Sequence, residues 1–165
     1  MKKNDVSSQA SEGKFNYRVG AIIMDSEKIL MATNSGSNHY YTVGGRVKFG
    51  ETAQEAVLRE VLEEIKMSLE IERLAFIHEN FFIWGEDKTP THEIALFFLM
   101  KPNKHLMKMD FSAIKESYGE VSFHWLSIGE LDKLKVYPDF LYDELKNFPK
   151  DILHLVTKGN ITVRT

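Results

Sequence analysis

Runs of apolar and β-branched residues, separated by short polar turns, recur along this chain and predict a protein rich in strands. The turns contain the glycine, asparagine and serine residues that favour loops, as in residues 34–38 and 84–91. The predicted strands cover residues 15–24, 29–33, 40–43, 69–82, 93–100 and 120–126. The pattern indicates only a variable connection over 101–118 and is ambiguous over 150–165.

Three other segments have the spacing of helices. The longest, residues 51–65, contains neither glycine nor proline and follows a glycine-rich segment, residues 43–45, that we interpret as a turn. Shorter helices are predicted over 128–134 and 139–148, the second bounded by Pro138 and Pro149. Strands on both sides of a long helix indicate an α/β sandwich with a mixed sheet.

The longest predicted helix carries three acids on an unexpected side. Successive helical residues lie about 100° apart, so with Glu60 at zero Glu64 falls at roughly 40° and Glu63 at roughly 300°. Ala56 and Val57 share this arc, at roughly 320° and 60°. The opposite arc, at roughly 220–260°, holds Glu55, Arg59 and Lys66. The three acids therefore point with the small and apolar side chains, not with the solvated ones.

An acidic helix face is ordinarily a solvated surface, but carboxylates beside apolar residues repel one another and lose hydration. A positive group must neutralise them, and two groups are candidates. One is the guanidinium of Arg59. The other, which we favour, is a hard cation, because Mg²⁺ prefers oxygen ligands and Glu60 and Glu64 lie one helical turn apart.

Residues 45–67 resemble the Nudix box. That family pattern places a glycine, a glutamate six positions later, an Arg-Glu pair and a Glu-Glu pair. The chain fills these positions with Gly45, Glu51, Arg59, Glu60, Glu63 and Glu64. The one departure is Lys66, where the family has a glycine that ends the helix in a left-handed conformation. Outside the box, the order of elements agrees over residues 15–148.

The resemblance implies an α/β/α sandwich with a mixed sheet and a Mg²⁺ cofactor, for which Mn²⁺ can substitute. It implies hydrolysis of a pyrophosphate bond in a nucleoside diphosphate linked to another group X, or in a nucleoside triphosphate. The implied metal ligands are Glu60, Glu63, Glu64 and the backbone carbonyl of Gly45. Glu60, Glu63 and Arg59 are the implied catalytic residues. Arg59 would orient the carboxylates by pairing with Glu51, and the alternative is a plain surface ion pair.

The box does not identify the residue that takes a proton from the attacking water. Glu93 and Glu120 are the candidates outside the box, because each begins a predicted strand. Each is equally well interpreted as a surface acid at a strand end.

Substrate contacts are the least determined part of the sequence. Arg18 and Arg46 are candidates for holding phosphates. Tyr41 and Trp84 are candidates for stacking on a base. Packing in the core or at the rim is an equal alternative for the two aromatic residues, and solvation is one for the arginines.

Composition narrows the class of protein. The chain of 165 residues, with 43% hydrophobic and 27% charged residues, predicts one domain over residues 15–165 after a disordered polar tail, residues 1–14. A net charge of -3 argues against a general nucleic-acid or membrane binder. The resemblance implies a small-molecule nucleotide or pyrophosphate substrate as the partner. No signal peptide or membrane span is predicted. We expect a cytoplasmic protein, and a homodimer stays open.

Two classes of function remain. The first is a Nudix pyrophosphohydrolase, favoured because no acid of the box is missing. The second is a catalytically silent Nudix-fold module that senses a nucleotide. A Nudix-fold isomerase is disfavoured, because its usual acid/base pair includes a cysteine and this chain has none.

Overall fold

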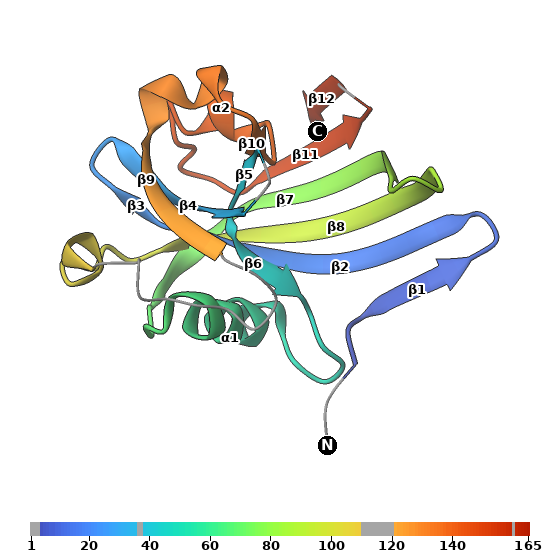
Figure 1. Ribbon diagram of the computed structural model, residues 1–165, viewed down its shortest axis with the longest axis horizontal. Coiled ribbons are helices and arrows are strands. Elements are labelled where there is room, and N and C mark those ends of the chain that lie inside the picture. The colour runs from blue at the N-terminus through green and yellow to red at the C-terminus, as the bar shows by residue number, and fades with distance from the viewer. Residues whose placement is uncertain (1–3, 36–37, 110–120, 160) are drawn as a thin grey trace.

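Two β-sheets lie between short helical segments in the computed structural model, which describes residues 4–35, 38–109, 121–159 and 161–165 (Figure 1). The strands are β1 Ser7–Ala10, β2 Gly13–Ile22, β3 Met24–Asp25, β4 Lys28–Asn34, β5 Tyr40–Tyr41, β6 Val43–Arg46, β7 Ile71–Trp84, β8 Thr89–Met100, β9 Val121–Ser127, β10 Val136–Tyr137, β11 Leu153–Lys158 and β12 Ile161–Arg164. The helical segments are α1 Ala53–Ile65, η1 Leu106–Lys108, η3 Ile128–Lys133 and α2 Leu141–Glu144.

Both sheets are mixed, as predicted. Within the described residues, the larger sheet has the strand order β1-β2-β8-β7-β11-β12, with β6 beside β2. The smaller sheet has the order β10-β5-β4-β3, with β9 beside β4. Strand β2 runs parallel to β8 and β11 runs parallel to β7, whereas β7 and β8 form a long antiparallel hairpin. None of the helices described is long and apolar enough to cross a membrane.

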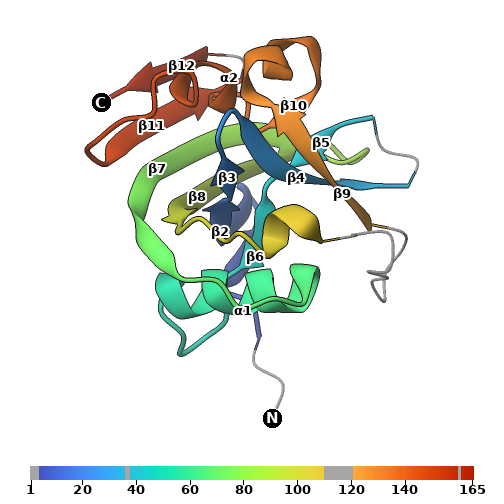
Figure 2. The same ribbon diagram turned by 90° about the vertical axis from the view of Figure 1, so that its left-hand side faces the viewer.

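The helical segments cover the larger sheet from two sides, which confirms the α/β/α layering (Figures 1 and 2). Helix α1 packs Ala56, Val57, Val61 and Ile65 into one core cluster, together with alternate residues of β2 and β8. Segments η3 and α2 pack into a second cluster on the other face. This second helical layer is smaller than predicted, because residues 128–133 form a 3-10 helix and α2 is a single turn.

The glycine segment before α1 is a strand, and the interpretation of residues 43–45 as a turn is wrong. Val43 pairs with Ala21, and the pairing continues to Arg46 opposite Arg18. A β-carbon at Gly44 would lie 2.2 Å from the carbonyl oxygen of Val19. The glycine therefore permits a close approach of two strands, which the sequence alone does not distinguish from a turn.

The structure also differs from the expected disordered tail over residues 1–14. Strand β1 pairs with β2, with Ser7 opposite Asn16. Asp5 forms an isolated backbone β-bridge with Lys48. The segment is mostly polar, with Val6 packed against the core cluster of α1, and polar residues on an edge strand protect against aggregation. At the other end of the chain, the ambiguous residues 150–165 contain β11 and β12.

Helix α1 has well-defined ends. Thr52 caps its first turn, accepting from the backbone N–H of Glu55, whose carboxylate in turn accepts from the N–H of Thr52. At the other end, Lys66 has φ 58° and ψ 25°, the left-handed conformation that the family gives to glycine. A β-carbon makes this conformation unfavourable, so Lys66 is a strained replacement.

We therefore expect Lys66→Gly to raise the free energy of unfolding by roughly 0.5–1 kcal/mol. Denaturant titration followed by circular dichroism measures the change. Loss of the bond from the Lys66 ammonium to the carbonyl of Glu63 acts in the opposite sense, but it is exposed and weak. A clear loss of stability would show that the left-handed conformation carries no strain.

Candidate functional site

Helix α1 and strand β6 lie side by side and bring the two halves of the motif together (Figures 1 and 2). The carboxylate of Glu60 lies directly against Gly45, where a β-carbon would be 2.4 Å from Oε1. One turn later on the helix, Glu64 accepts a hydrogen bond of 3.1 Å from the backbone N–H of Gly44. The strand glycines thus hold two helix carboxylates at fixed positions.

Arg59 is the centre of the polar contacts around these acids. Its Nε and Nη2 donate to the carboxylate of Glu51 at 3.1 and 3.0 Å, as the sequence predicted. Its Nη1 donates to Glu60 at 2.7 Å and to Glu63 at 3.2 Å. Its Nη2 also donates to the backbone carbonyl of Arg46 at 3.1 Å, so the guanidinium joins the helix to β6.

The protonation of this ion-pair network is fixed by its charges. Burial alone would lower the pKa of the Arg59 guanidinium, but the hydrogen bonds and charges of Glu51 and Glu60 outweigh burial and raise it. Burial alone would raise the pKa of the Glu51 carboxyl, but Arg59 and the backbone N–H of Lys48 outweigh it and lower it. Arg59 and Glu51 are therefore both charged at neutral pH.

Glu63 differs from the other two helix acids in its exposure. Its side chain is 53% exposed, compared with 15% for Glu60. Besides Arg59, it faces the ammonium of Lys48 at 3.9 Å. Among Glu60, Glu63 and Glu64, Glu63 is therefore the exposed carboxylate.

The donor set fits a hard divalent cation in its chemistry, because it consists of carboxylate and carbonyl oxygens. Within the described residues, no three His, Asp or Glu side chains are already arranged around a common metal position. In this arrangement Arg59 supplies the positive charge, which was the first of the two candidates from sequence. A carboxylate has two oxygens with several lone pairs, so Glu60 and Glu64 can bind a cation while they keep these contacts.

Glu93 lies elsewhere than the sequence suggested. It shares its face of β8 with Ala95 and Phe97, which belong to the second core cluster, whereas α1 packs on the other face. Its partners are Asn16 Nδ2 at 3.4 Å and Arg18 Nε at 3.9 Å. Burial raises the pKa of the Glu93 carboxyl, although Arg18 and Asn16 act in the opposite sense. The other candidate base, Glu120, lies outside the described residues.

Of the predicted substrate contacts, the two arginines are brought together. Arg18 and Arg46 are register partners on β2 and β6, and Arg46 Nη1 also contacts Asp5 at 3.4 Å. Tyr41 packs against the first core cluster, and its hydroxyl donates to Asn34 at 2.6 Å. Trp84 is 65% exposed at the outer end of β7, well away from α1 (Figure 1). Trp84 is thus not part of this site.

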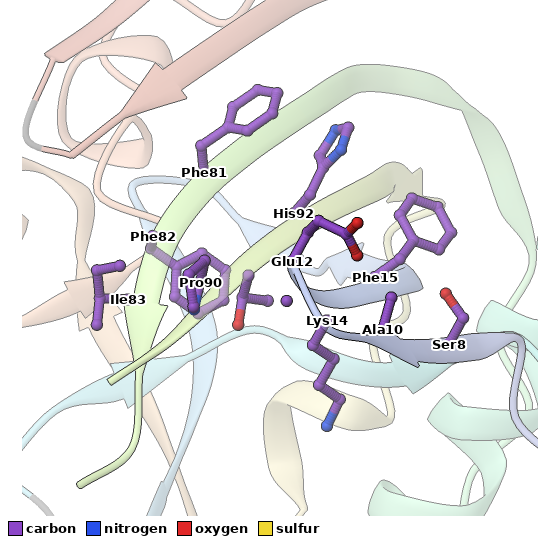
Figure 3. Close-up of a pocket in the computed structure, with 12 residues that line it drawn as sticks. Ser8, Ala10, Glu12, Lys14, Phe15, Phe81, Phe82, Ile83, Pro90 and His92 are labelled. Atoms are coloured by element: carbon purple, nitrogen blue, oxygen red, sulfur yellow. The ribbon is translucent and has the colours of Figure 1, made fainter. Parts of the chain in front are cut away.

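Among the described residues, the sequence gave no means of locating two of the hollows. One, of about 510 Å³, lies at the outer ends of the β1–β2 and β7–β8 hairpins, and Phe15, Phe81 and His92 are among the side chains around it (Figure 3). The rings of Phe81 and His92 stack there, with their centroids 4.1 Å apart. The other, of about 350 Å³, lies between β7, β11 and the β10–α2 segment and includes Asn80 and Tyr137.

Comparisons with known proteins identify the family and the fold. A family model described as the NUDIX domain matches residues 14–148. A MutT protein from Bacillus halodurans has a similar fold, with a TM-score of 0.61, 17% identity and coverage of 86% of this chain and 88% of that chain. A NUDIX hydrolase from Nitrosomonas europaea has a TM-score of 0.58 and 21% identity, with coverage of 81% of this chain and 87% of that chain. An ADP-ribose pyrophosphatase from Streptococcus suis has a TM-score of 0.55 and 14% identity, with coverage of 86% of this chain and 98% of that chain.

Proposed function

The chain belongs to the Nudix hydrolase family and is a pyrophosphohydrolase, and we propose that its substrate is a nucleoside diphosphate linked to a second group X, or a nucleoside triphosphate. The observation that carries the proposal is the approach of Glu60 to Gly45, with Glu64 held on Gly44. This approach gathers the acids of the box at one edge of the sheet. A monoester offers a single phosphoryl group and would be a poor substrate.

The family generally uses divalent metals, and we propose Mg²⁺, with Mn²⁺ as a substitute. Glu60 and Glu64 would be the main ligands, with the carbonyl of Gly45 completing the set and Glu63 sharing the ion or bridging to it through water. When bound, the ion would shield the charge of the pyrophosphate, lower the pKa of water and stabilise the leaving oxygen. The acids supply the oxygen ligands that this ion prefers.

The chain's own residues would orient the box carboxylates and take a proton from the attacking water. Arg59 would hold Glu51, Glu60 and Glu63 in place through the contacts described above. Because Glu93 contacts β2 instead of the helix, we propose Glu63, the exposed acid of the box, as the group that accepts a proton from the attacking water. Arg18 and Arg46, on the neighbouring strands β2 and β6, would bind the phosphates of the substrate.

The names of two similar structures support this substrate class. One is called an ADP-ribose pyrophosphatase and another a UDP-X diphosphatase. Both names describe a nucleoside diphosphate joined to another group. The absence of cysteine agrees with a reducing compartment, and we propose a cytoplasmic location on that basis.

A panel of nucleoside diphosphate and triphosphate derivatives, incubated with Mg²⁺ and analysed by mass spectrometry, tests the proposal. We expect a nucleoside monophosphate and phosphorylated X from the first class, or a monophosphate and pyrophosphate from the second. Tight binding without turnover across the panel would favour the alternative, a nucleotide-sensing module. The presence of every box acid favours the hydrolase.

A further inference from the structure

A row of polar side chains crosses the larger sheet on the face opposite α1. Asn16 on β2 is the register partner of Glu93 on β8, and Glu93 is the register partner of Asn80 on β7. The row continues to Thr157 on β11, opposite Asn80. Register partners on one face lie within about 5.5 Å at their β-carbons, so these side chains are direct neighbours.

This row carries hydrogen-bonding capacity that the protein itself leaves unused. Asn16 is only 5% exposed, and its Oδ1 is buried without a hydrogen-bond partner among the described residues. Its Nδ2 donates to Oε2 of Glu93, the same oxygen that faces Arg18. A buried acceptor without a partner costs about 1–3 kcal/mol, so Oδ1 of Asn16 would gain from a donor outside the described chain.

The row opens into the 350 Å³ hollow at its Asn80 end. Of the row, Asn80 and Thr157 line the hollow, and His78 and the largely exposed Tyr137 line it as well. Burial lowers the pKa of His78 to about 4, and this neutral ring is hydrogen-bonded to Thr157 at 2.8 Å. An amide beside an aromatic ring, in a hollow at the small end of the range for ligand sites, suits a planar heterocycle.

We propose that the row Asn16–Glu93–Asn80 binds the base of the nucleotide and prefers a base with two adjacent N–H groups beside a carbonyl, the pattern of guanine. This inference rests on the proposed function. A carboxylate accepts from two N–H groups, and a neighbouring amide donates to the carbonyl. Adenine and cytosine present an amino group beside a ring acceptor, and uracil presents one N–H between two carbonyls, so each leaves part of the row unpaired.

The row and the side chains of Arg18 and Arg46 lie on one face of the sheet, and β6, which carries Arg46, also contacts α1. Moving from Asn80 across β8 and β2 leads to Arg18 and then to Arg46 on β6, whose carbonyl is bound by Arg59. Three strand spacings separate β7 from β6, roughly 14 Å at about 4.8 Å each. Arg46 Nε is also buried without a partner in the described part of the chain. A nucleotide lying across the strands would place its base on the row and its phosphates on the arginines.

Equilibrium binding of GMP, AMP, CMP and UMP, measured by calorimetry, tests this inference without any turnover. We expect GMP to bind most tightly. Glu93→Gln and Asn80→Ala should each lower the affinity for GMP by roughly 10- to 100-fold, the range for a lost hydrogen bond to a charged or buried group. Binding of ribose 5-phosphate, which has no base, should not change. Glu79→Gln, on the opposite face of β7 beside Asn80, is the matched control and should leave GMP binding unchanged.

The outcomes separate this inference from the proposed function. A GMP preference that depends on Glu93, in a protein that hydrolyses nothing in the substrate panel, supports the base row and contradicts the hydrolase. Equal affinity for the four nucleotides would overturn the inference. So would a Glu93→Gln variant that binds GMP normally but has lost turnover on all substrates equally, because Glu93 would then act as the general base.

Discussion

Glu60→Gln and Glu64→Gln are each expected to lower turnover by a factor of about 10²–10⁴, the range for lost charge stabilisation or proton transfer. Each substitution removes one negative charge from the oxygen ligands while keeping the side chain's shape. The expected loss lies in turnover and not in folding, because the glutamine amide keeps an oxygen that can accept from Arg59 or from the N–H of Gly44. Steady-state kinetics on the best substrate of the panel, with circular dichroism for folding, measure both.

Glu55→Gln is the matched control for these two variants. Glu55 lies on the same helix, but its carboxylate is used to cap the first turn at Thr52, and glutamine can take the same place. We expect its turnover to match that of the unaltered protein. If Glu55→Gln were as damaging as Glu60→Gln, the helix face assigned to the metal would be the wrong one.

Gly45→Ala is expected to reduce turnover by roughly 100-fold, because a displacement of about 1 Å in a catalytic group has an effect of this size. The new β-carbon would lie 2.4 Å from Oε1 and 2.7 Å from Oε2 of Glu60, so the carboxylate must move. Movement of Glu60 would also break its 2.7 Å contact with Arg59. Kinetics and a metal-binding titration on the same preparation show whether the ligand position has shifted.

Gly129→Ala provides the comparison, because the nearest atom to its new β-carbon is at 3.9 Å, an ordinary contact. It should leave turnover unchanged. Normal turnover and metal affinity in Gly45→Ala would show that the closeness of Gly45 and Glu60 is not needed for activity.

The sequence predicted the parts of this protein that depend on local spacing. The helix that carries Glu60 and Glu64, the Arg59–Glu51 pair and the strands of the mixed sheets all follow from periodicity or from the motif. The motif marks Lys66 as the position of the family's glycine but leaves open how the helix ends there, and the structure shows the left-handed conformation.

The parts that could not be predicted depend on register between distant segments. In sequence Gly44 indicates a turn, but its pairing with Gly20 on β2 makes it a strand residue. Glu93 reads as a strand-end acid, and only the pairing with Asn16 and Asn80 places it in a polar row away from α1. Strand β1 is too polar to be recognised, because its pairing uses backbone groups that every sequence has.

The most direct test of the account is hydrolysis in heavy-oxygen water, with the metal removed and then restored. The protein is treated with excess chelator, incubated with its best pyrophosphate substrate, and then given Mg²⁺ or Mn²⁺. We predict no turnover in chelator, recovery with either ion, and label in one phosphoryl product, because water is the nucleophile. Full activity in excess chelator, or rapid cleavage of simple phosphate monoesters, would contradict a metal-dependent pyrophosphohydrolase.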